Sequence, residues 1–183
     1  MRRSVWLLAL GACEIAPPPA PIEVPSEPVP LGPDAITGAE ASSYLDDKGT
    51  AFLPRHAVDG DRNTAWCEGA DGLGEGESLT VTLKRDINLA EIRIDGGFFK
   101  DDRTLTNNGR PRKIKVSADS GWSHILSLPK VPPREHRAKE IKTKPGVIAN
   151  PGSASKITFT LIQSDEGRFT KDVCISEIAF IPM

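Results

Sequence analysis

The stretch "AVDGDRNTAWCEGADGLGEGES", residues 57–78, crowds glycines, acids, one tryptophan and one cysteine into a single segment. Its first part has the composition of a tight turn. Gly60 can take positive φ, and aspartate side chains accept hydrogen bonds from backbone amides two residues ahead. Asp59 and Asp61 fill those positions, and Trp66 follows as a large apolar side chain that can plug a core. The segment therefore predicts a sharp corner that sends an aromatic residue into the interior.

The corner is also rich in hard oxygen ligands of the kind that Ca²⁺ prefers: Asp59, Asp61, Asn63 and Thr64. It is not an EF-hand, since the glycine and the closing glutamate of that loop are misplaced. A metal-free turn is the alternative, because turn chemistry alone accounts for the same residues.

The second part of the segment alternates glycines with acids. The glycines at 69, 72, 74 and 76 permit sharp reversals and close approach of the backbone. A catalytic pair of acids needs a fixed separation, whereas Glu75 and Glu77 alternate with glycines, which make the backbone flexible. We expect these two glutamates to form a solvated or hydrogen-bonding edge.

Composition narrows the class of protein. The 183 residues suggest one domain with accessory segments, and only 5% are aromatic, so the core must consist mainly of Val, Ile, Leu and Ala. With a net charge of -2, the protein has no overall positive charge that would attract nucleic acid, so we exclude nucleic acid as a partner.

The first residues, "MRRSVWLLALGAC", have the features of an export signal. Two arginines precede an apolar run that is too short to span a bilayer and ends in small residues. The run "LGAC" resembles a bacterial lipoprotein signal, which implies removal of residues 1–12 and a lipid anchor on Cys13. Glu14 follows in place of aspartate, so an outer-membrane lipoprotein is expected in a cell with two membranes. An ordinary secretory signal is the alternative.

Residues 13–33 are predicted to be a tether. Half of the chain's 16 prolines lie within 17–33, and proline fixes φ and lacks an amide donor. Such a segment forms neither helix nor sheet and extends as a semi-rigid spacer of about 3 Å per residue.

Residues 34–183 have an all-β pattern. Short runs alternate apolar and polar residues, Gly, Pro and Asn punctuate them, and no stretch keeps a period of 3.6 over three turns. This pattern indicates an antiparallel β-sandwich whose buried faces include Ile114, Val116 and the apolar positions of "KITFTLI". The expected strands are 79–83, 89–95, 113–118, 156–162 and 174–181, with weaker candidates at 124–128 and 139–143.

The motif A-x-DGD-x-x-TAW resembles the discoidin (coagulation-factor type C) superfamily, a jelly-roll β-sandwich used for carbohydrate and surface binding. Blocks at 68–77, 107–116 and 172–180 look like the discoidin-like glycan-binding domain that accompanies secreted bacterial NAD glycohydrolases. Ser78 departs from this family, which favours an aromatic residue after "GEGE". These 183 residues leave no segment for a catalytic domain, so we do not expect the family name to denote an activity here.

The resemblance also suggests a metal site and a place for two cysteines. In sugar-binding relatives an Asp-Gly turn and an acid near the C-terminus share a structural Ca²⁺, which implies the ligand set Asp59, Asp61, Thr64 and Glu177. In an exported protein Cys67 and Cys174 are expected to pair, since the sandwich brings the last strand beside the corner. Two buried thiols are the alternative.

The segment 96–111, "GGFFKDDRTLTNNGRP", is the candidate ligand site. It combines aromatic rings with Asn, Asp and Arg side chains, which together suit a sugar, and the candidate contacts are Phe99, Lys100, Asp101, Asn107, Asn108 and Arg110. In the structural alternative the phenylalanines are core, the charges are solvated, and Arg110 holds the loop against an acid such as Asp102.

No catalytic constellation is present: the chain lacks a GxSxG elbow, a phosphate loop and zinc-ligand spacing. We therefore expect a surface-tethered, non-catalytic module without a required cofactor, whose partner is a glycan or another envelope component. The alternative is a lipoprotein that docks a protein partner or a secreted enzyme in the cell envelope.

Overall fold

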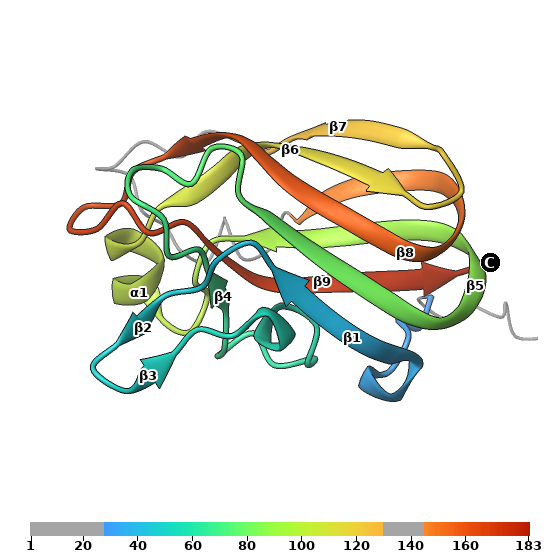
Figure 1. Ribbon diagram of the computed structural model, residues 1–183, viewed down its shortest axis with the longest axis horizontal. Helices are drawn as coiled ribbons and strands as arrows, with labels where there is room; N and C mark the ends of the chain where they lie inside the picture. The colour runs from blue at the N-terminus through green and yellow to red at the C-terminus, as the bar shows by residue number, and fades with distance from the viewer. Residues whose placement is uncertain (1–27, 130–144) are drawn as a thin grey trace, which may run out of the picture.

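The structure is a computed structural model and describes residues 28–129 and 145–183. The predicted signal peptide, Cys13, most of the tether and the strand candidate at 139–143 lie outside the described residues. Within the described part, no helix is long and apolar enough to cross a membrane. The described residues form an antiparallel β-sandwich whose loops lie together at one end (Figure 1).

One seven-stranded sheet makes up the sandwich, in the order β4-β9-β5-β8-β6-β7 with β1 paired to β5. A small hairpin, β2–β3, stands apart from it, and two 3-10 turns and one short helix complete the fold. The elements are η1 (Pro33–Ala35), β1 (Ile36–Ala41), β2 (Asp46–Asp47), β3 (Thr50–Ala51), η2 (Pro54–Ala57), β4 (Trp66–Cys67), β5 (Ser78–Gly96), α1 (Asp102–Asn107), β6 (Arg110–Ala118), β7 (Ser123–Ser127), β8 (Gly146–Asp165) and β9 (Cys174–Pro182).

Strand β5 belongs to both layers. Residues 79–83 pair with β1, residues 89–96 pair with β9, and β8 follows β5 through both halves. Between the halves the register shifts, and three consecutive charged residues, 84–86, are exposed where the ribbon turns back (Figure 1). The two runs expected as separate strands are therefore two halves of one bent strand, because the charged residues break the apolar alternation without ending the backbone pairing.

Strand β8 also runs through a predicted turn. Pro151 and Gly152 lie inside the strand, where Asn150 and Gly152 take positive φ of 48° and 110°. A Cβ on Gly152 would lie 3.1 Å from Cδ1 of Trp122, so the glycine also permits close approach of an indole ring. The Pro-Gly pair bends the strand instead of reversing the chain.

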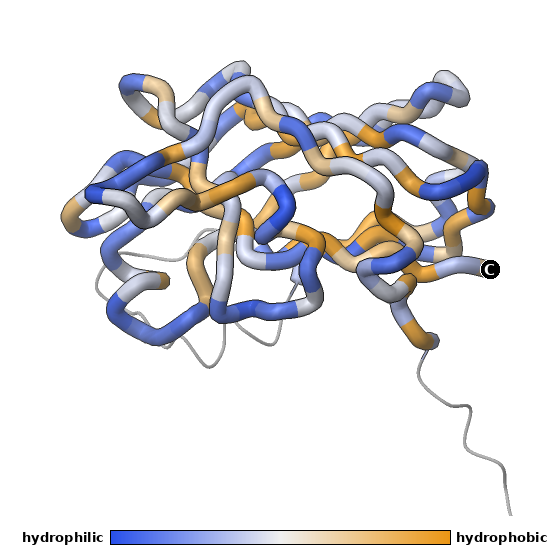
Figure 2. The backbone as a smooth tube through the Cα atoms, turned by 60° about the horizontal axis from the view of Figure 1, so that its bottom comes forward, coloured by the Kyte–Doolittle hydropathy of each residue, from blue (hydrophilic) through white to orange (hydrophobic). Residues whose placement is uncertain are grey.

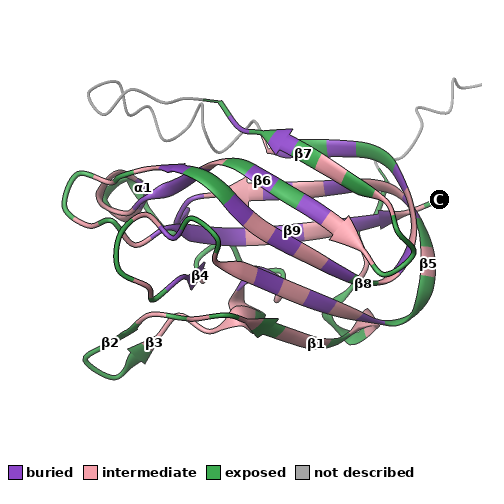
Figure 3. Ribbon diagram, turned by 45° about the horizontal axis from the view of Figure 1, so that its top comes forward, coloured by how far each residue is buried: buried purple, intermediate pink, exposed green. Residues whose placement is uncertain are grey.

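The core follows the predicted alternation. Ile114, Val116, Ile157 and Phe159 are 0% exposed and Leu161 is 1% exposed, which confirms those positions. Bands of buried and exposed residues alternate along the strands (Figure 3), and hydrophobic and hydrophilic residues are interleaved along the chain (Figure 2). Aliphatic side chains from both layers thus fill the interior, as the low aromatic content requires.

The side chain of Trp66 packs in the core, as expected. Its side chain is fully buried, and its indole Nε1 donates a 3.0 Å hydrogen bond to the carbonyl oxygen of Ser43. A buried indole needs such an acceptor for its polar edge. The corner at 57–66 is therefore anchored both by apolar packing and by one directed bond to the segment after β1.

The predicted disulfide is confirmed. Cys67 and Cys174 are bonded, with a sequence separation of 107 and Cα atoms 4.0 Å apart. They are direct partners in the β4–β9 pairing. The bond therefore joins the corner to the last strand of the fold.

Removing this bond is expected to destabilise the domain strongly. The double substitution Cys67→Ala and Cys174→Ala should lower the free energy of unfolding by roughly 4–5 kcal/mol, because a loop of this length gains much entropy when unfolded. Urea unfolding followed by tryptophan fluorescence measures the change. Reductant should destabilise the wild type and leave the double variant unaffected; a wild type insensitive to full reduction would contradict the prediction.

Candidate functional site

Four segments meet at one end of the sandwich, opposite the bend of β5 (Figure 1). They are the β2–β3 hairpin and the segments 68–77, 97–109 and 166–173. Backbone bonds tie them together: Gly109 N–H donates to the Asp172 carbonyl at 2.9 Å, and Leu45 N–H donates to the Cys67 carbonyl at 2.9 Å. We call this surface the loop end.

The segment predicted as an open ligand loop contains the helix α1. Six residues are too few to show a helical period in the sequence, which is why the pattern did not indicate it. Asp101 caps the helix: its Oδ1 accepts a 2.7 Å bond from the Thr104 amide, which holds the pKa of Asp101 below its usual value. Lys100 and Arg103, on either side of this cap, are exposed.

Both phenylalanines of the segment are core residues. Phe98 is 8% exposed and packs edge-on against Phe52 beside the disulfide, with ring centroids 5.8 Å apart. Phe99 is 4% exposed, packs on Leu105 and lies 5.2 Å beneath the guanidinium of Arg62. Neither ring offers a face to a ligand, so Phe99 has the structural role weighed as the alternative.

Asn107 and Asn108 brace a neighbouring loop. The Asn107 carbonyl accepts bonds from the amides of Phe169 and Thr170 at 3.3 and 3.0 Å. The Asn108 side chain donates to the Thr104 carbonyl at 2.8 Å and accepts from Thr170 Oγ1 at 3.2 Å. These bonds hold the 166–170 turn against α1, and they engage the Asn108 side chain that the sequence had suggested for a ligand.

Arg110 is also internal, with 8% of its surface exposed. It pairs in register with Asp165 on β8, and this charge, rather than Asp102, acts favourably on it, while burial lowers the pKa of the guanidinium. Of the six predicted contacts, only Lys100 and Asp101 are exposed, since Asn107 and Asn108 are half-buried and Phe99 and Arg110 are buried.

The structure shows an exposed aromatic residue, Phe169, that was not predicted from the sequence as a site residue. Phe169 is 71% exposed, and the guanidinium of Arg168 lies 5.2 Å from its ring centroid. Tyr44, 48% exposed, belongs to the connection from β1 to β2. The available signal was the polar, non-alternating run "SDEGRFTK" between two strands, where a single phenylalanine has no core to enter.

Two glutamates of the 68–77 segment, Glu68 and Glu77, are held by hydrogen bonds within the fold. Glu68 is fully buried, and its carboxylate accepts from the amides of Val173 at 3.0 Å and Ala70 at 2.8 Å, while burial raises its pKa. Glu77 accepts 2.5 Å bonds from the hydroxyls of Ser42 and Ser43. Glu75 is exposed, so Glu75 and Glu77 form the solvated and hydrogen-bonding edge that the sequence predicted.

The corner places several oxygens around one hydroxyl. Thr64 Oγ1 lies 2.8 Å from Asp59 Oδ2, 2.9 Å from the Asp61 carbonyl and 3.3 Å from the His56 carbonyl. A hydroxyl has one hydrogen, so it cannot satisfy all three of these acceptors at once. A hard cation such as Ca²⁺ can be coordinated by carboxylate, carbonyl and hydroxyl oxygens together. Asp61 contributes its carbonyl here, because its carboxylate accepts instead from Asn63.

Glu177 reaches the same corner from β9. Its Oε2 accepts a 3.0 Å bond from the Gly60 amide, and it pairs across strands with Asp95. Burial, followed by repulsion from Asp59 and Asp95, raises the pKa of Glu177 to about 8. Among the residues that the structure describes, no three His, Cys, Asp or Glu side chains form a metal site, so a cation here would depend on hydroxyl and carbonyl oxygens as well.

The chain belongs to the family of NAD glycohydrolase translocation F5/8 type C domains, whose pattern matches residues 32–181. This match covers the corner, the loop end and every strand of the sandwich. No curated protein matches the sequence.

Solved structures with the same fold include carbohydrate-binding modules. The module CBM32-3 from a family 31 glycoside hydrolase of Clostridium perfringens has a TM-score of 0.61 at 20% identity, covering 84% of this chain and 95% of its own. The family 32 module of C. perfringens NanJ, solved in complex with galactose, has a TM-score of 0.56 at 22% identity, covering 82% and 96%. At these identities the likeness establishes the fold, a discoidin-like jelly roll.

The raised pKa of Glu177 predicts a pH dependence of stability in the absence of metal. A carboxyl group whose folded pKa, about 8, exceeds its unfolded value, 4.5, binds more protons in the folded state. The contribution of Glu177 to the free energy of unfolding should therefore be fully present below about pH 4.5 and be lost as the pH rises through about 8. Urea titrations in chelator across this range measure the slope.

Glu177→Gln should flatten that slope, since the amide does not ionise. Buried Glu68 and Asp95, whose pKa values burial also raises, retain part of it. Glu75→Gln, a substitution at an exposed glutamate, is the matched control and should keep the wild-type slope. A Glu177→Gln slope equal to that of the wild type would refute the assignment.

Proposed function

We propose that this domain is a non-catalytic module that binds carbohydrate through its loop end, with Phe169 at the centre of the contact surface. The single observation behind the proposal is a phenylalanine that is 71% exposed on a hydrogen-bonded turn. Aromatic faces are the usual platforms for sugar rings, because a pyranose has an apolar face that stacks on them. The sugar-binding modules that share the fold support this choice.

The turn is rigid, which favours binding. Besides the bonds to Asn107, the Arg168 amide donates to the Thr106 carbonyl at 2.9 Å, and a Cβ on Gly167 would lie 2.1 Å from the Asn107 carbonyl oxygen. A preordered ring loses little conformational entropy when a ligand stacks on it. The backbone at Phe169 is therefore ordered when the domain folds, and ligand binding loses little further conformational entropy there.

Polar groups around the ring suit hydroxyl ligands. Arg168 lies beside Phe169, and exposed Lys100 and Arg103 come from the neighbouring α1 segment. Each hydroxyl exchanges a water bond for a protein bond with a net gain of about 1 kcal/mol. One stacked ring with a few such bonds gives affinities in the micromolar to millimolar range.

Weak single sites become effective when many copies share a surface. A lipid anchor on Cys13 and the proline-rich segment 13–33 would present the domain in this way, in the cell envelope or, without the anchor, as a secreted protein. The alternative partner is a secreted enzyme or another envelope protein, which the translocation role in the family description favours.

Phe169→Ala is expected to weaken glycan binding about tenfold, because a stacked ring contributes about 1.5 kcal/mol. A glycan array on the full-length chain identifies a ligand, and calorimetry with that glycan measures the loss. Ile125→Ala, which truncates another exposed apolar residue on β7, is the matched control and should bind normally. Lys100→Ala should also weaken binding without changing the melting temperature.

An array without any positive glycan would reject the carbohydrate proposal and favour the protein-docking alternative. Normal binding by Phe169→Ala would place the sugar elsewhere on the domain.

We further propose that the corner holds a structural Ca²⁺ through Asp59, Thr64, Glu177 and the carbonyl of Asp61. The support is the convergence of oxygens on Thr64 Oγ1 and the position of Glu177 near Asp59. The ion would neutralise two carboxylates that otherwise repel each other, and so would fasten the corner to β9.

Saturating Ca²⁺, at a hundred times its Kd, should raise the free energy of unfolding by about 2.7 kcal/mol relative to chelator. The gain should be smaller at pH 5, where protonation of Glu177 competes with the ion. Asp59→Asn should abolish it, whereas Asp61→Asn, which alters a carboxylate directed at Asn63, should retain it. Identical melting curves in chelator and in millimolar Ca²⁺ would establish the metal-free turn.

A further inference from the structure

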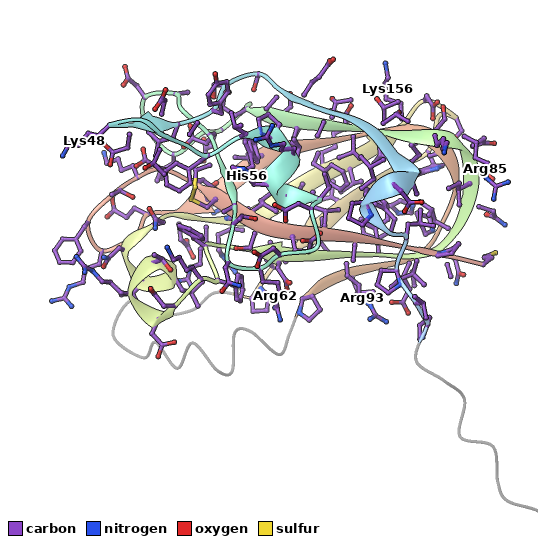
Figure 4. All side chains as sticks on the ribbon, turned by 90° about the horizontal axis from the view of Figure 1, so that it is seen from below. Lys48, His56, Arg62, Arg85, Arg93 and Lys156 are labelled. Carbon is purple, nitrogen blue, oxygen red and sulfur yellow. A yellow bond between two sulfur atoms is a disulfide. The ribbon has the colours of Figure 1, made fainter. Side chains whose placement is uncertain are left out.

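A cavity of about 310 Å³ opens on the outer face of β5 and β9, away from the loop end. One wall comes from Arg93 and Asp95 of β5 and from Glu177 and Ala179 of β9. The opposite wall comes from Leu31, at the end of the tether, and from the corner. Figure 4 shows Arg62 and Arg93 on the same side of the molecule.

The polar side of the cavity offers donors and acceptors together. Arg62 Nε donates to Asp95 Oδ2 at 2.7 Å, and its guanidinium rests over the ring of Phe99, so both side chains are fixed. Arg93 Nε donates to Glu91 Oε2 at 2.8 Å. A guanidinium has four further N–H donors, so this pair leaves Arg93 able to bind a second group.

Asp95 also has an unused acceptor. Its Oδ1 is buried and accepts no hydrogen bond from any described residue. Buried acceptors in proteins almost always have a donor. Because Asp95 lines the cavity, a hydroxyl group bound there can supply that donor.

The apolar side of the cavity is fixed as well. Val58, from the corner, is 6% exposed, and the Leu31 amide donates a 2.8 Å bond to the Phe180 carbonyl. An apolar wall that faces a mixed polar wall matches a sugar ring, which has an apolar face and hydroxyl edges that both donate and accept. Arg62 and Arg93 are each paired with a carboxylate, Asp95 and Glu91 respectively, and this charge balance favours a neutral ligand.

We propose that this cavity is a second carbohydrate site, which takes a neutral hexose in contact with Arg93, Asp95 and Ala179. Its volume is near the lower limit for small-molecule pockets, which suits one or two rings. The proposal stands on the cavity itself and does not depend on the loop end.

The test is backbone NMR of the full-length chain titrated with D-galactose and D-glucose. At least one hexose should cause saturable shifts of the amides of Val58, Asp95 and Ala179, with millimolar affinity. Arg93→Gln should weaken this binding about tenfold, the loss expected for a charged hydrogen-bond donor. Arg85→Gln, at an exposed arginine on the bend of β5, is the matched control and should bind as the wild type does.

Ala179→Trp should abolish the shifts, because an indole beside Arg93 occupies the cavity without removing a polar group. The dispersion of the spectrum shows whether that variant folds, and if it does not, Arg93→Gln decides the outcome. Phe169→Ala should leave these shifts intact, which separates this site from the loop end. Absence of cavity shifts with both hexoses, or their persistence in folded Ala179→Trp, would overturn the proposal.

Discussion

The short pairing of β4 with β9 is the interaction on which the surfaces of this domain depend. It places Trp66 in the core, joins Cys67 to Cys174 and brings Glu68 under the Val173 amide. Two residues of strand would be a weak attachment without these additions. The disulfide, the buried indole and the buried carboxylate together fix the corner to the last strand, and the loop end and the cavity both border on it.

Many polar side chains at the loop end serve the fold. Asp101 caps α1, Asn108 bridges α1 to the 166–170 turn, and Glu77 binds two serine hydroxyls. Each bond satisfies a donor or acceptor that would otherwise destabilise an irregular segment. The consequence is a rigid end whose exposed groups, Phe169 and Arg168 among them, keep a defined geometry. Rigidity of this kind suits recognition of a polar ligand, for which the net gain per contact is small.

The acids of the domain illustrate how burial changes their role. Both Glu68 and Glu177 accept from backbone amides, but burial, followed by repulsion from Asp59 and Asp95, raises the pKa of Glu177 to about 8. The first is a satisfied structural clamp. The protonation of Glu177 therefore changes with pH near neutrality, and the corner responds to pH through this group.

Sequence patterns alone were sufficient for the all-β class, the buried faces of β6 and β8, and the burial of Trp66, because alternation and turn chemistry are local properties. They also predicted the Cys67–Cys174 pair. They did not separate a bent strand from two strands at residues 84–86, nor indicate α1, since six residues carry no period. Above all, the role of each polar or aromatic residue at the loop end was decided by tertiary structure. Phe99 and Phe169 are the same residue type in similarly polar surroundings, yet Phe99 has Leu105 and Arg62 to cover it and Phe169 has open solvent. Burial depends on which distant segments pack against a residue, and only the folded chain determines that.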